Sequence, residues 1–232
     1  MKKWIGLLIL FFGSGCLFAQ DTGHWQSVDS AAVMYLQKIG EQSALYNGKE
    51  EENYPKMLND PYYVDWKFAK ARLSYNGVIY PEALLRLDLY RDDLIIISPH
   101  FHQFVLFPEN VDFVELHARH IIYFRQDSLP GCPSSGYYFL LHSGACKVLE
   151  KQSFKTKYND RSELIFVPDN SYYLYKDGVY HVIRNRRGLL NVLQPYGKQL
   201  KRFISSLRLR FGHDAERIIQ LAVSEYEKIA AW

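Results

Sequence analysis

The sequence predicts an α+β protein with an N-terminal helix, an antiparallel β-meander sheet and C-terminal amphipathic helices packed on the sheet. Three observations predict this class. Short apolar runs alternate with tight turns through the middle of the chain, no helical segment separates them, and helical spacing of apolar residues returns towards the C-terminus. We divide the chain into a signal peptide (1–19) and a single α+β domain (20–232), which comprises a helix and extended arm (20–60), the antiparallel sheet (61–183) and basic helices (184–232).

The first 19 residues are typical of a cleaved bacterial signal peptide. Lys2 and Lys3 precede an uncharged run of 16 residues, which ends in small residues at Ala19 before the polar chain begins. The run is shorter than the roughly 20 residues that a membrane-spanning helix needs. We therefore expect an exported protein that is periplasmic or associated with the outer membrane.

Cys16 offers an alternative end to the signal, in which a lipoprotein is anchored through this cysteine. Such signals usually carry leucine or another aliphatic residue three positions earlier, where this chain has Gly13. This difference favours cleavage after Ala19.

The chain after the signal is expected to begin with a helix and an extended arm. Apolar residues recur at helical spacing over 27–39, Asp29 or Ser30 can cap the first turn, and Gly40 ends the pattern. Residues 46–59 are polar and rich in turn formers, which predicts a loop or an extended arm.

Tight turns predict several β-hairpins. Asn76-Gly77 and Asp177-Gly178 each separate two short alternating runs, and both dipeptides suit the positive φ values of a type I′ turn. Further strands are expected at 84–90, 94–98, 103–107, 111–116, 121–124, 137–142 and 145–151.

The C-terminal segment is expected to form three helices. A short helix at 189–193 precedes Pro195, which suits the first turn of a second helix, and Asp214 can cap the third. Apolar residues define the buried faces: Leu200, Phe203, Ile204 and Leu207 on the second helix, and Ile218, Ile219, Ala222, Tyr226 and Ile229 on the third.

Positive charge is concentrated in these helices. Residues 181–232 contain ten Lys or Arg against four Asp or Glu, a net charge of +6. Lys198, Lys201 and Arg202 therefore belong either to a solvated helix face or to a surface that meets anionic lipid. For an exported protein we expect an envelope protein or a glycan as the partner, an anionic lipid surface as a further possibility, and no nucleic acid.

Cys132 and Cys146 remain after signal cleavage. An oxidising compartment permits a disulfide between them, and a loop of this length would stabilise the fold by about 3 kcal/mol. A hairpin that turns at Ser143-Gly144 instead places Cys146 opposite Leu141. A disulfide and two free thiols are both open at this point.

Four motifs occur in a recognisable order. They are IGEQSALYNG at 39–48, YNGVIY at 75–80, LDLYRDDL at 87–94, and YKDGVY at 175–180 followed by a Leu-Leu step and basic helices. In this order they resemble a family of exported envelope proteins from Bacteroidota, and the resemblance covers most of the mature chain. It implies an envelope protein of uncharacterised function and supplies no catalytic residues.

Two pairs of histidines are the candidate metal ligands. His100 and His102 are two residues apart, so in a strand they would share one face, and His117 and His120 flank a tight turn. If the two turns met, four imidazoles could bind zinc. No spacing in the sequence brings them together, so exposed turn histidines are the alternative, and we expect no cofactor.

Arg86, Asp88 and Tyr90 are candidate binding residues, because they alternate with leucines and so share the polar face of a strand. An Arg–Asp pair there could orient a ligand, or could be an ordinary ion pair. The 18 tyrosines of the chain suit sugar binding on hairpin faces and equally suit packing within a sheet.

The common signatures of hydrolases, phosphate-binding glycine loops, zinc peptidases and dinucleotide-binding enzymes are missing from the sequence. We therefore expect a non-catalytic exported protein that binds a partner in the cell envelope. The alternative is an envelope hydrolase that acts on glycan or peptide through a site built from the histidine-bearing turns.

Overall fold

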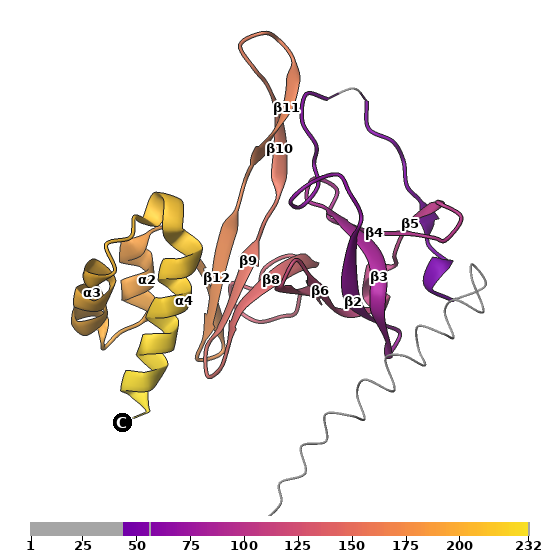
Figure 1. Ribbon diagram of the computed structural model, residues 1–232. Helices are drawn as coiled ribbons and strands as arrows, with labels where there is room; N and C mark the ends of the chain where they lie inside the picture. The colour runs from indigo at the N-terminus through magenta and orange to yellow at the C-terminus, as the bar shows by residue number, and fades with distance from the viewer. Residues whose placement is uncertain (1–43, 56, 232) are drawn as a thin grey trace, which may run out of the picture.

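A computed structural model of the protein describes residues 44–55 and 57–231 (Figure 1). The predicted signal peptide, Cys16 and the predicted helix at 27–39 lie outside these residues. Within them, an antiparallel sheet of eleven strands is followed by three C-terminal helices, which confirms the predicted α+β class.

The strands of the large sheet lie in the order β1-β5-β4-β3-β2-β6-β7-β8-β9-β12-β13, and β10 and β11 form a separate hairpin. A short 3-10 helix, η2 (Ala44–Tyr46), precedes β1, and η3 (Pro108–Asn110) precedes β6. The strands are β1 (Lys49–Glu50), β2 (Ala69–Tyr75), β3 (Val78–Asp88), β4 (Asp93–Ile97), β5 (Gln103–Val105), β6 (Val111–Leu116), β7 (Arg119–Phe124), β8 (Gly136–Ser143), β9 (Lys147–Lys151), β10 (Phe154–Tyr158), β11 (Leu164–Pro168), β12 (Ser171–Lys176) and β13 (Val179–Ile183).

The sheet departs from a simple meander at one step. Strand β6 does not pair with β5, which precedes it, but returns to pair with β2, with Val114 opposite Leu73. Strand β5 pairs instead with β1, where Val105 lies opposite Lys49. This arrangement makes β2 a central strand, which buries Leu73 completely (0% exposed).

The predicted hairpin turns are confirmed by their backbone angles. Asn76-Gly77 has φ values of 53° and 73°, and Asp177-Gly178 has values of 51° and 82°. Positive φ at both central positions is the requirement of a type I′ turn. The β6–β7 turn reaches the same region without glycine, with φ values of 49° at His117 and 59° at Ala118.

Strand β3 is longer than predicted. The short run expected after Asn76-Gly77, at 78–80, and the strand expected at 84–90 form one strand of 11 residues across Pro81. The register of β2 on β3 shifts between Ala71 and Leu73. This irregularity accommodates the proline, which has no N–H for the ladder.

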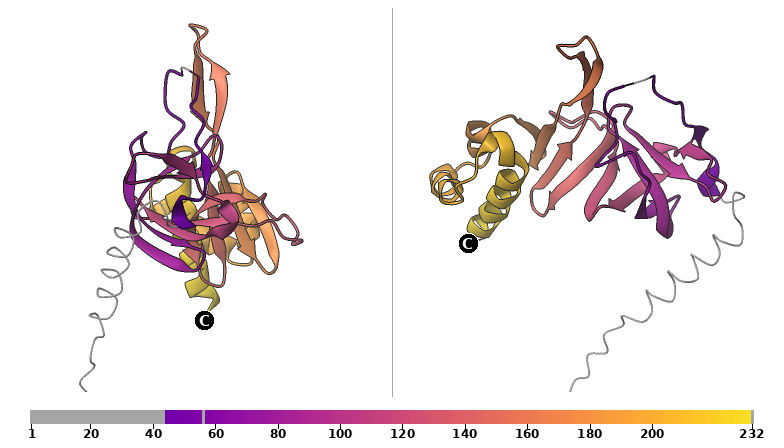
Figure 2. Two further views of the ribbon diagram at one scale, coloured as in Figure 1. Left: turned by 90° about the vertical axis from the view of Figure 1, so that its right-hand side faces the viewer. Right: turned by 45° about the horizontal axis from the view of Figure 1, so that its top comes forward.

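The β10–β11 hairpin was not among the predicted strands. It projects from the body of the sheet, beside the arm that precedes β2 (Figures 1 and 2). The arm contacts it directly, since the Leu58 N–H donates to the Leu164 carbonyl and the Asn59 side chain bonds both backbone groups of Phe166. Most of β10 is exposed, so its sequence lacks the apolar alternation of a buried strand.

The helices are α2 (Arg186–Val192), α3 (Gly197–Ser206) and α4 (Phe211–Ala230). Of these, α4 packs on the sheet at β8 and β9, whereas α3 packs on α4 and α2. The expectation that the C-terminal helices pack on the sheet is therefore confirmed for α4 and wrong for α3. No helix in the described part of the chain is both long and apolar enough to cross a membrane.

The ends of the helices differ from the predicted ones by a few residues. Helix α2 begins after Asn185, whose side chain accepts the Gly188 N–H at 2.8 Å. Helix α3 begins two residues after Pro195. Asp214 lies inside α4 with non-helical angles (φ −116°, ψ 27°), and its carboxylate accepts the Arg210 N–H at 2.9 Å.

Side chains are buried on both faces of the sheet. The main core includes Tyr137 and the buried face of α4, with Ile218, Ile219, Ala222 and Val223. A smaller cluster on the other face is built from Tyr138, Leu149 and Tyr180. Consecutive residues of a strand point to opposite faces, which is why Tyr137 and Tyr138 enter different clusters.

Candidate functional site

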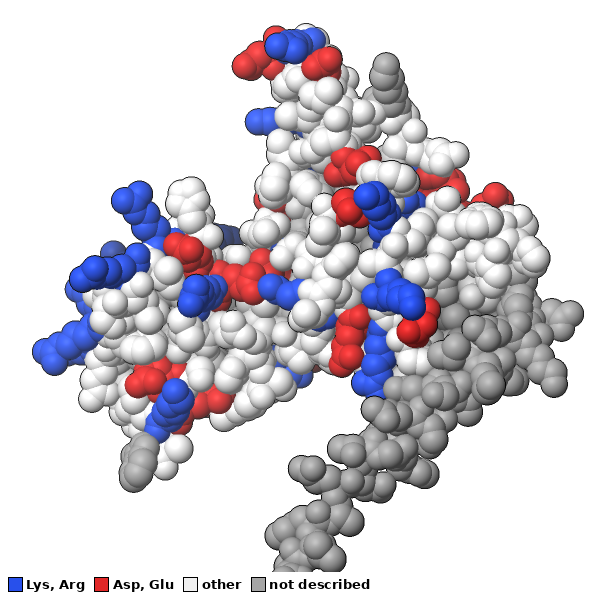
Figure 3. Space-filling view, in the orientation of Figure 1, with Lys and Arg blue, Asp and Glu red and all other residues white. Residues whose placement is uncertain are grey.

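The most distinctive surface lies in the segment between the sheet and α4. Residues 178–213 contain eight Lys or Arg and no Asp or Glu. We call residues 184–210, which hold α2 and α3, the basic unit. In Figure 3, Lys and Arg gather at the end of the molecule formed by these helices, whereas both signs of charge mix over the sheet.

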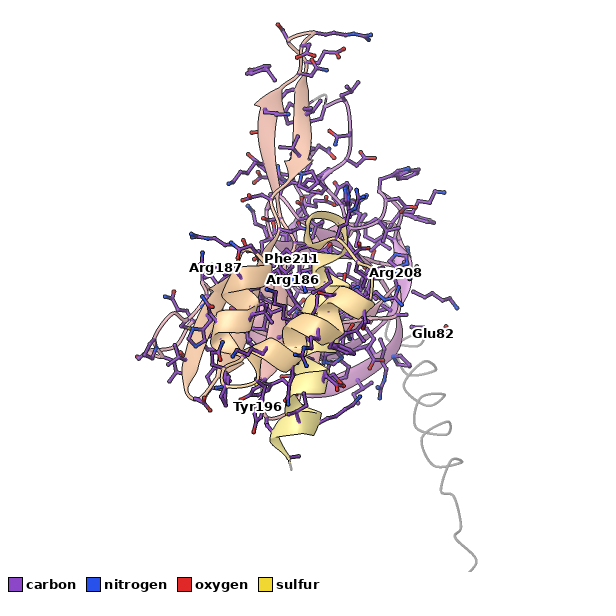
Figure 4. The ribbon with its side chains drawn as sticks, turned by 90° about the vertical axis from the view of Figure 1, so that its left-hand side faces the viewer. Glu82, Arg186, Arg187, Tyr196, Arg208 and Phe211 are labelled. Carbon is purple, nitrogen blue, oxygen red and sulfur yellow. The ribbon has the colours of Figure 1, made fainter. Side chains whose placement is uncertain are left out.

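The two helices of the basic unit enclose an open groove of about 550 Å³. Figure 4 faces these helices and labels Arg186 and Arg187 on α2 and Tyr196 just before α3. The groove is lined by Arg186, Arg187, Leu190, Asn191, Gln194, Gly197, Lys198 and Lys201.

Helical spacing explains why these residues meet. Arg187 and Asn191 are four residues apart on α2, and Lys198 and Lys201 are three apart on α3, so each pair shares a helix face. Gly197 lies close to α2, because a Cβ there would lie 3.2 Å from the Leu190 carbonyl oxygen.

Arg186 joins the two helices. Its Nη2 donates to the Lys201 carbonyl at 2.8 Å and to the Ser205 hydroxyl at 2.7 Å. Its Nε is buried and has no hydrogen-bond partner among the described residues. The guanidinium is thus held in one orientation by α3.

The remaining cations of the groove lack carboxylate partners. Arg187, Lys198 and Lys201 form no ion pair with any described residue. Lys198 also lies in the first turn of α3, where the helix dipole disfavours positive charge. Like charges at this spacing destabilise a helix by about 0.2–0.5 kcal/mol per pair. The groove therefore concentrates positive charge without internal compensation.

The structure separates the three predicted cations of this segment. Lys198, Lys201 and Arg202 are all exposed on α3, but only the two lysines line the groove. Three further residues of the groove were not among those predicted from the sequence: Arg186, Arg187 and Asn191. The absence of acidic residues from 178–213 was the available signal for the groove, and the packing of α2 on α3 was not predictable from it.

Arg86, by contrast, is a buried structural residue. Its guanidinium lies between the rings of Tyr62 and Phe68, at 3.9 and 4.4 Å from their centroids. It pairs with Glu51 at 2.7 Å rather than with Asp88, and the exposed fractions of the two side chains are 8% and 6%. Arg86 therefore fixes the arm on the sheet and is not available to a ligand.

Asp88 is also buried, with 1% of its surface exposed. Its carboxylate accepts the backbone N–H groups of Tyr90 and Arg91 at 2.8 and 2.9 Å and the hydroxyl of Tyr54. These bonds shape the β3–β4 turn and hold the arm above it.

Tyr90 is the exposed member of the predicted trio, with 44% of its surface accessible. Its ring packs against Phe166 and Tyr54, at centroid distances of 5.1 and 6.1 Å. The tyrosines expected on hairpin faces mostly pack as well: Tyr137, Tyr138 and Tyr180 are buried, and Tyr172, Tyr173 and Tyr175 are partly buried.

The two histidine pairs lie apart. His100 and His102 belong to the β4–β5 connection, and His117 and His120 to the β6–β7 hairpin. Because β4 and β6 run in opposite directions in the sheet, these connections lie at opposite ends of the strands. Across residues 44–55 and 57–231, no group of three or more His, Cys, Asp or Glu side chains could hold a metal ion.

Cys132 and Cys146 are both free thiols. Cys146 belongs to the main core, whereas Cys132 packs against the cluster on the other face of the sheet. The disulfide that the sequence left open is therefore not formed. Burial raises the pKa of the Cys146 thiol, which disfavours the reactive thiolate.

Glu227 of α4 is a polar anchor that the sequence analysis did not identify. Its carboxylate accepts the Cys146 N–H at 2.6 Å and lies 2.9 Å from His142 Nε2. Gly144 permits this approach, since a Cβ there would lie 2.4 Å from the carboxylate. Glu227 thus ties the helical end of the molecule to the β8–β9 turn.

Comparison with protein-family models, with curated proteins and with solved structures found no match for the chain.

Proposed function

We propose that this is a non-catalytic exported protein that binds an anionic, phosphate-rich surface of the bacterial cell envelope through the basic unit. The observation that carries the proposal is the run of eight Lys or Arg without an acidic residue over 178–213. A cluster of unpaired cations on one face attracts anions and weakens as salt rises.

The attachment of the basic unit to the sheet supports this function. Arg119 of β7 contacts Glu216 of α4 at 2.5 Å and Glu150 of β9 at 3.0 Å. Gln220 of α4 donates to the Leu141 carbonyl at 2.8 Å. These contacts, with that of Glu227, use acidic residues of α4 on its sheet side. Helix α2 contacts β13 and α3 packs on α4 and α2, while the lysines of α3 are exposed.

The residues outside the basic unit favour binding over catalysis. The Arg86 Nη atoms and the Asp88 carboxylate are bonded to groups of the protein itself, and only the Arg86 Nε of this network is left without a partner among the described residues. The histidine pairs that the hydrolase alternative requires lie at opposite ends of the strands. Export to the envelope rests on the signal-like sequence at 1–19 and on the resemblance to Bacteroidota envelope proteins.

The test is binding to phosphatidylglycerol vesicles at rising salt concentration. Reversal of three charges in Lys198→Glu/Lys201→Glu/Arg202→Glu should abolish cosedimentation, and added salt should weaken that of the unaltered protein. The matched control is Lys155→Glu/Lys157→Glu/Arg161→Glu, which reverses three exposed charges on the β10–β11 hairpin.

The control should retain binding. Equal losses in the two triple variants would reduce the effect to net charge and would contradict a role for the basic unit. Binding of the unaltered protein to neutral phosphatidylcholine vesicles to the same extent would contradict the proposal as well.

A further inference from the structure

We infer that the groove between α2 and α3 is a specific binding site for a phosphate group, carried either by a lipid headgroup or by a free phosphorylated molecule. The inference rests on the proposed function and deepens it, because a general attraction to anionic surfaces needs no groove. In this site the phosphate oxygens are bound by Arg187, Lys198 and Lys201. Arg186 is the positioning residue, which holds α2 against α3.

The donors of the groove come from both helices. Arg187 and Asn191 stand on α2, Lys198 and Lys201 on α3, and Gln194 between them. Arg offers a planar fork of N–H donors that matches phosphate oxygens, Lys adds a compact charge, and the two amides add neutral donors. An anion in the groove would thus meet donors from two directions.

The groove is also held in shape before any ligand arrives. The bonds from Arg186 to the Lys201 carbonyl and the Ser205 hydroxyl fix α2 against α3. Gly197 lets the two helices approach closely. A site formed in advance loses less conformational entropy on binding.

The local electrostatics are unfavourable without an anion. Lys198 is three residues from Lys201 and four from Arg202, so the exposed side of α3 carries neighbouring like charges. Arg186 and Arg187 occupy the first turn of α2, which contains no acidic residue. A sequence that breaks local rules at one place without internal compensation marks a functional surface.

A solvated basic face is the competing explanation, and one comparison separates the two. Arg187 and Arg202 are both exposed arginines of the basic unit, and neither forms an ion pair with a described residue. Only Arg187 lines the groove. If the basic unit is only a solvated face, replacement of either arginine should weaken anion binding equally. If the groove is a phosphate site, replacement of Arg187 should weaken it more.

The experiment titrates the purified protein with inorganic pyrophosphate by isothermal calorimetry, with citrate as a carboxylate comparison. Arg187→Ser should weaken pyrophosphate binding about tenfold or more, since it removes charge-assisted hydrogen bonds, and Arg202→Ser should weaken it less than about threefold. Citrate should bind more weakly than pyrophosphate.

Vesicles of phosphatidylglycerol identify the source of the phosphate. If free pyrophosphate and the vesicles both depend on Arg187 more than on Arg202, the groove takes the phosphate group in either form. If the vesicles alone show this dependence, the ligand is a lipid headgroup.

Equal effects of Arg187→Ser and Arg202→Ser in both assays would overturn the inference. In that case, salt-dependent vesicle binding that the triple reversal abolishes would leave the proposed function intact. Equal affinity for citrate and pyrophosphate would overturn the assignment to phosphate.

Discussion

At the scale of single residues, the candidate binding residues fall into two groups. Some are buried, as Arg86 is, and others are exposed, as Lys198 is. Arg86 and Glu51 are almost fully buried, and their ion pair is completed by Gln103 and by the Trp66 carbonyl. A buried charge is stable only while its partner remains. Arg86 is therefore a residue on which the attachment of the arm depends.

Arg86→Met is expected to lower the free energy of unfolding by about 3–5 kcal/mol, because it leaves the Glu51 carboxylate buried and unpaired. The double variant Arg86→Met/Glu51→Gln removes that orphaned charge and should be more stable than Arg86→Met alone. Equilibrium unfolding in urea measures both. A double variant less stable than Arg86→Met would show that the buried charge is not the cause.

The sequence could identify these residues but not their roles. Alternation with leucines placed Arg86 and Asp88 on one strand face, and that placement is visible from spacing alone. Their partners Glu51 and Tyr54 stand more than 30 positions earlier in the arm. No local pattern encodes which segment covers a strand face, so burial of this pair was not predictable.

At the scale of elements, turn chemistry was the strongest signal. Asn76-Gly77 and Asp177-Gly178 predicted two hairpins at the residues where they occur, because few residues tolerate positive φ at both central positions. The return of β6 to β2 was not predictable, since strand pairing at a distance depends on the whole core. The groove was missed for the same reason, because it requires the packing of α2 on α3.

Helix α4 is attached to the sheet by an acidic side chain whose effect depends on pH. Burial alone would raise the pKa of Glu227, but hydrogen bonds from the Cys146 N–H and from His142 outweigh it and hold the pKa below the ordinary value of 4.5. A carboxyl group with a depressed pKa stabilises the folded state above its ordinary pKa and loses this effect as pH falls through the folded value.

Glu227→Gln is expected to lower the free energy of unfolding by about 1–2 kcal/mol at pH 5, because a neutral amide accepts the Cys146 N–H more weakly. The difference from the unaltered protein should shrink towards pH 3. The control is Glu225→Gln, whose carboxylate contacts only the exposed Lys228 at 3.6 Å. A difference for Glu227→Gln that stays constant from pH 5 to pH 3 would contradict this account.

At the scale of the whole molecule, the sheet curls until distant strands meet (Figure 2). Asp92 in the β3–β4 turn contacts Lys151 at the end of β9 at 2.5 Å and accepts the Tyr137 N–H of β8. Four strands separate β3 from β9 in the sheet order. Burial raises the pKa of Asp92 and lowers that of Lys151, so each charge depends on the other.

A double-mutant cycle with Asp92→Asn and Lys151→Met is expected to give a coupling energy of about 1–3 kcal/mol, measured by urea unfolding. The exposed pair Lys70–Glu82, at 3.0 Å, provides the comparison. Its cycle with Lys70→Met and Glu82→Gln should give less than about 0.5 kcal/mol. Similar values for the two cycles would mean that partial burial does not strengthen the Asp92–Lys151 pair over an exposed one.

The position of the basic unit in the chain has an evolutionary consequence. The unit is inserted between the last strand, β13, and α4, and its charged residues are mostly exposed. Substitutions at exposed positions usually change stability by less than about 0.5 kcal/mol. Mutation can therefore alter the charge of this segment while its buried leucines, the sheet and α4 stay unchanged, so that related proteins could diverge in recognition while they keep a common scaffold.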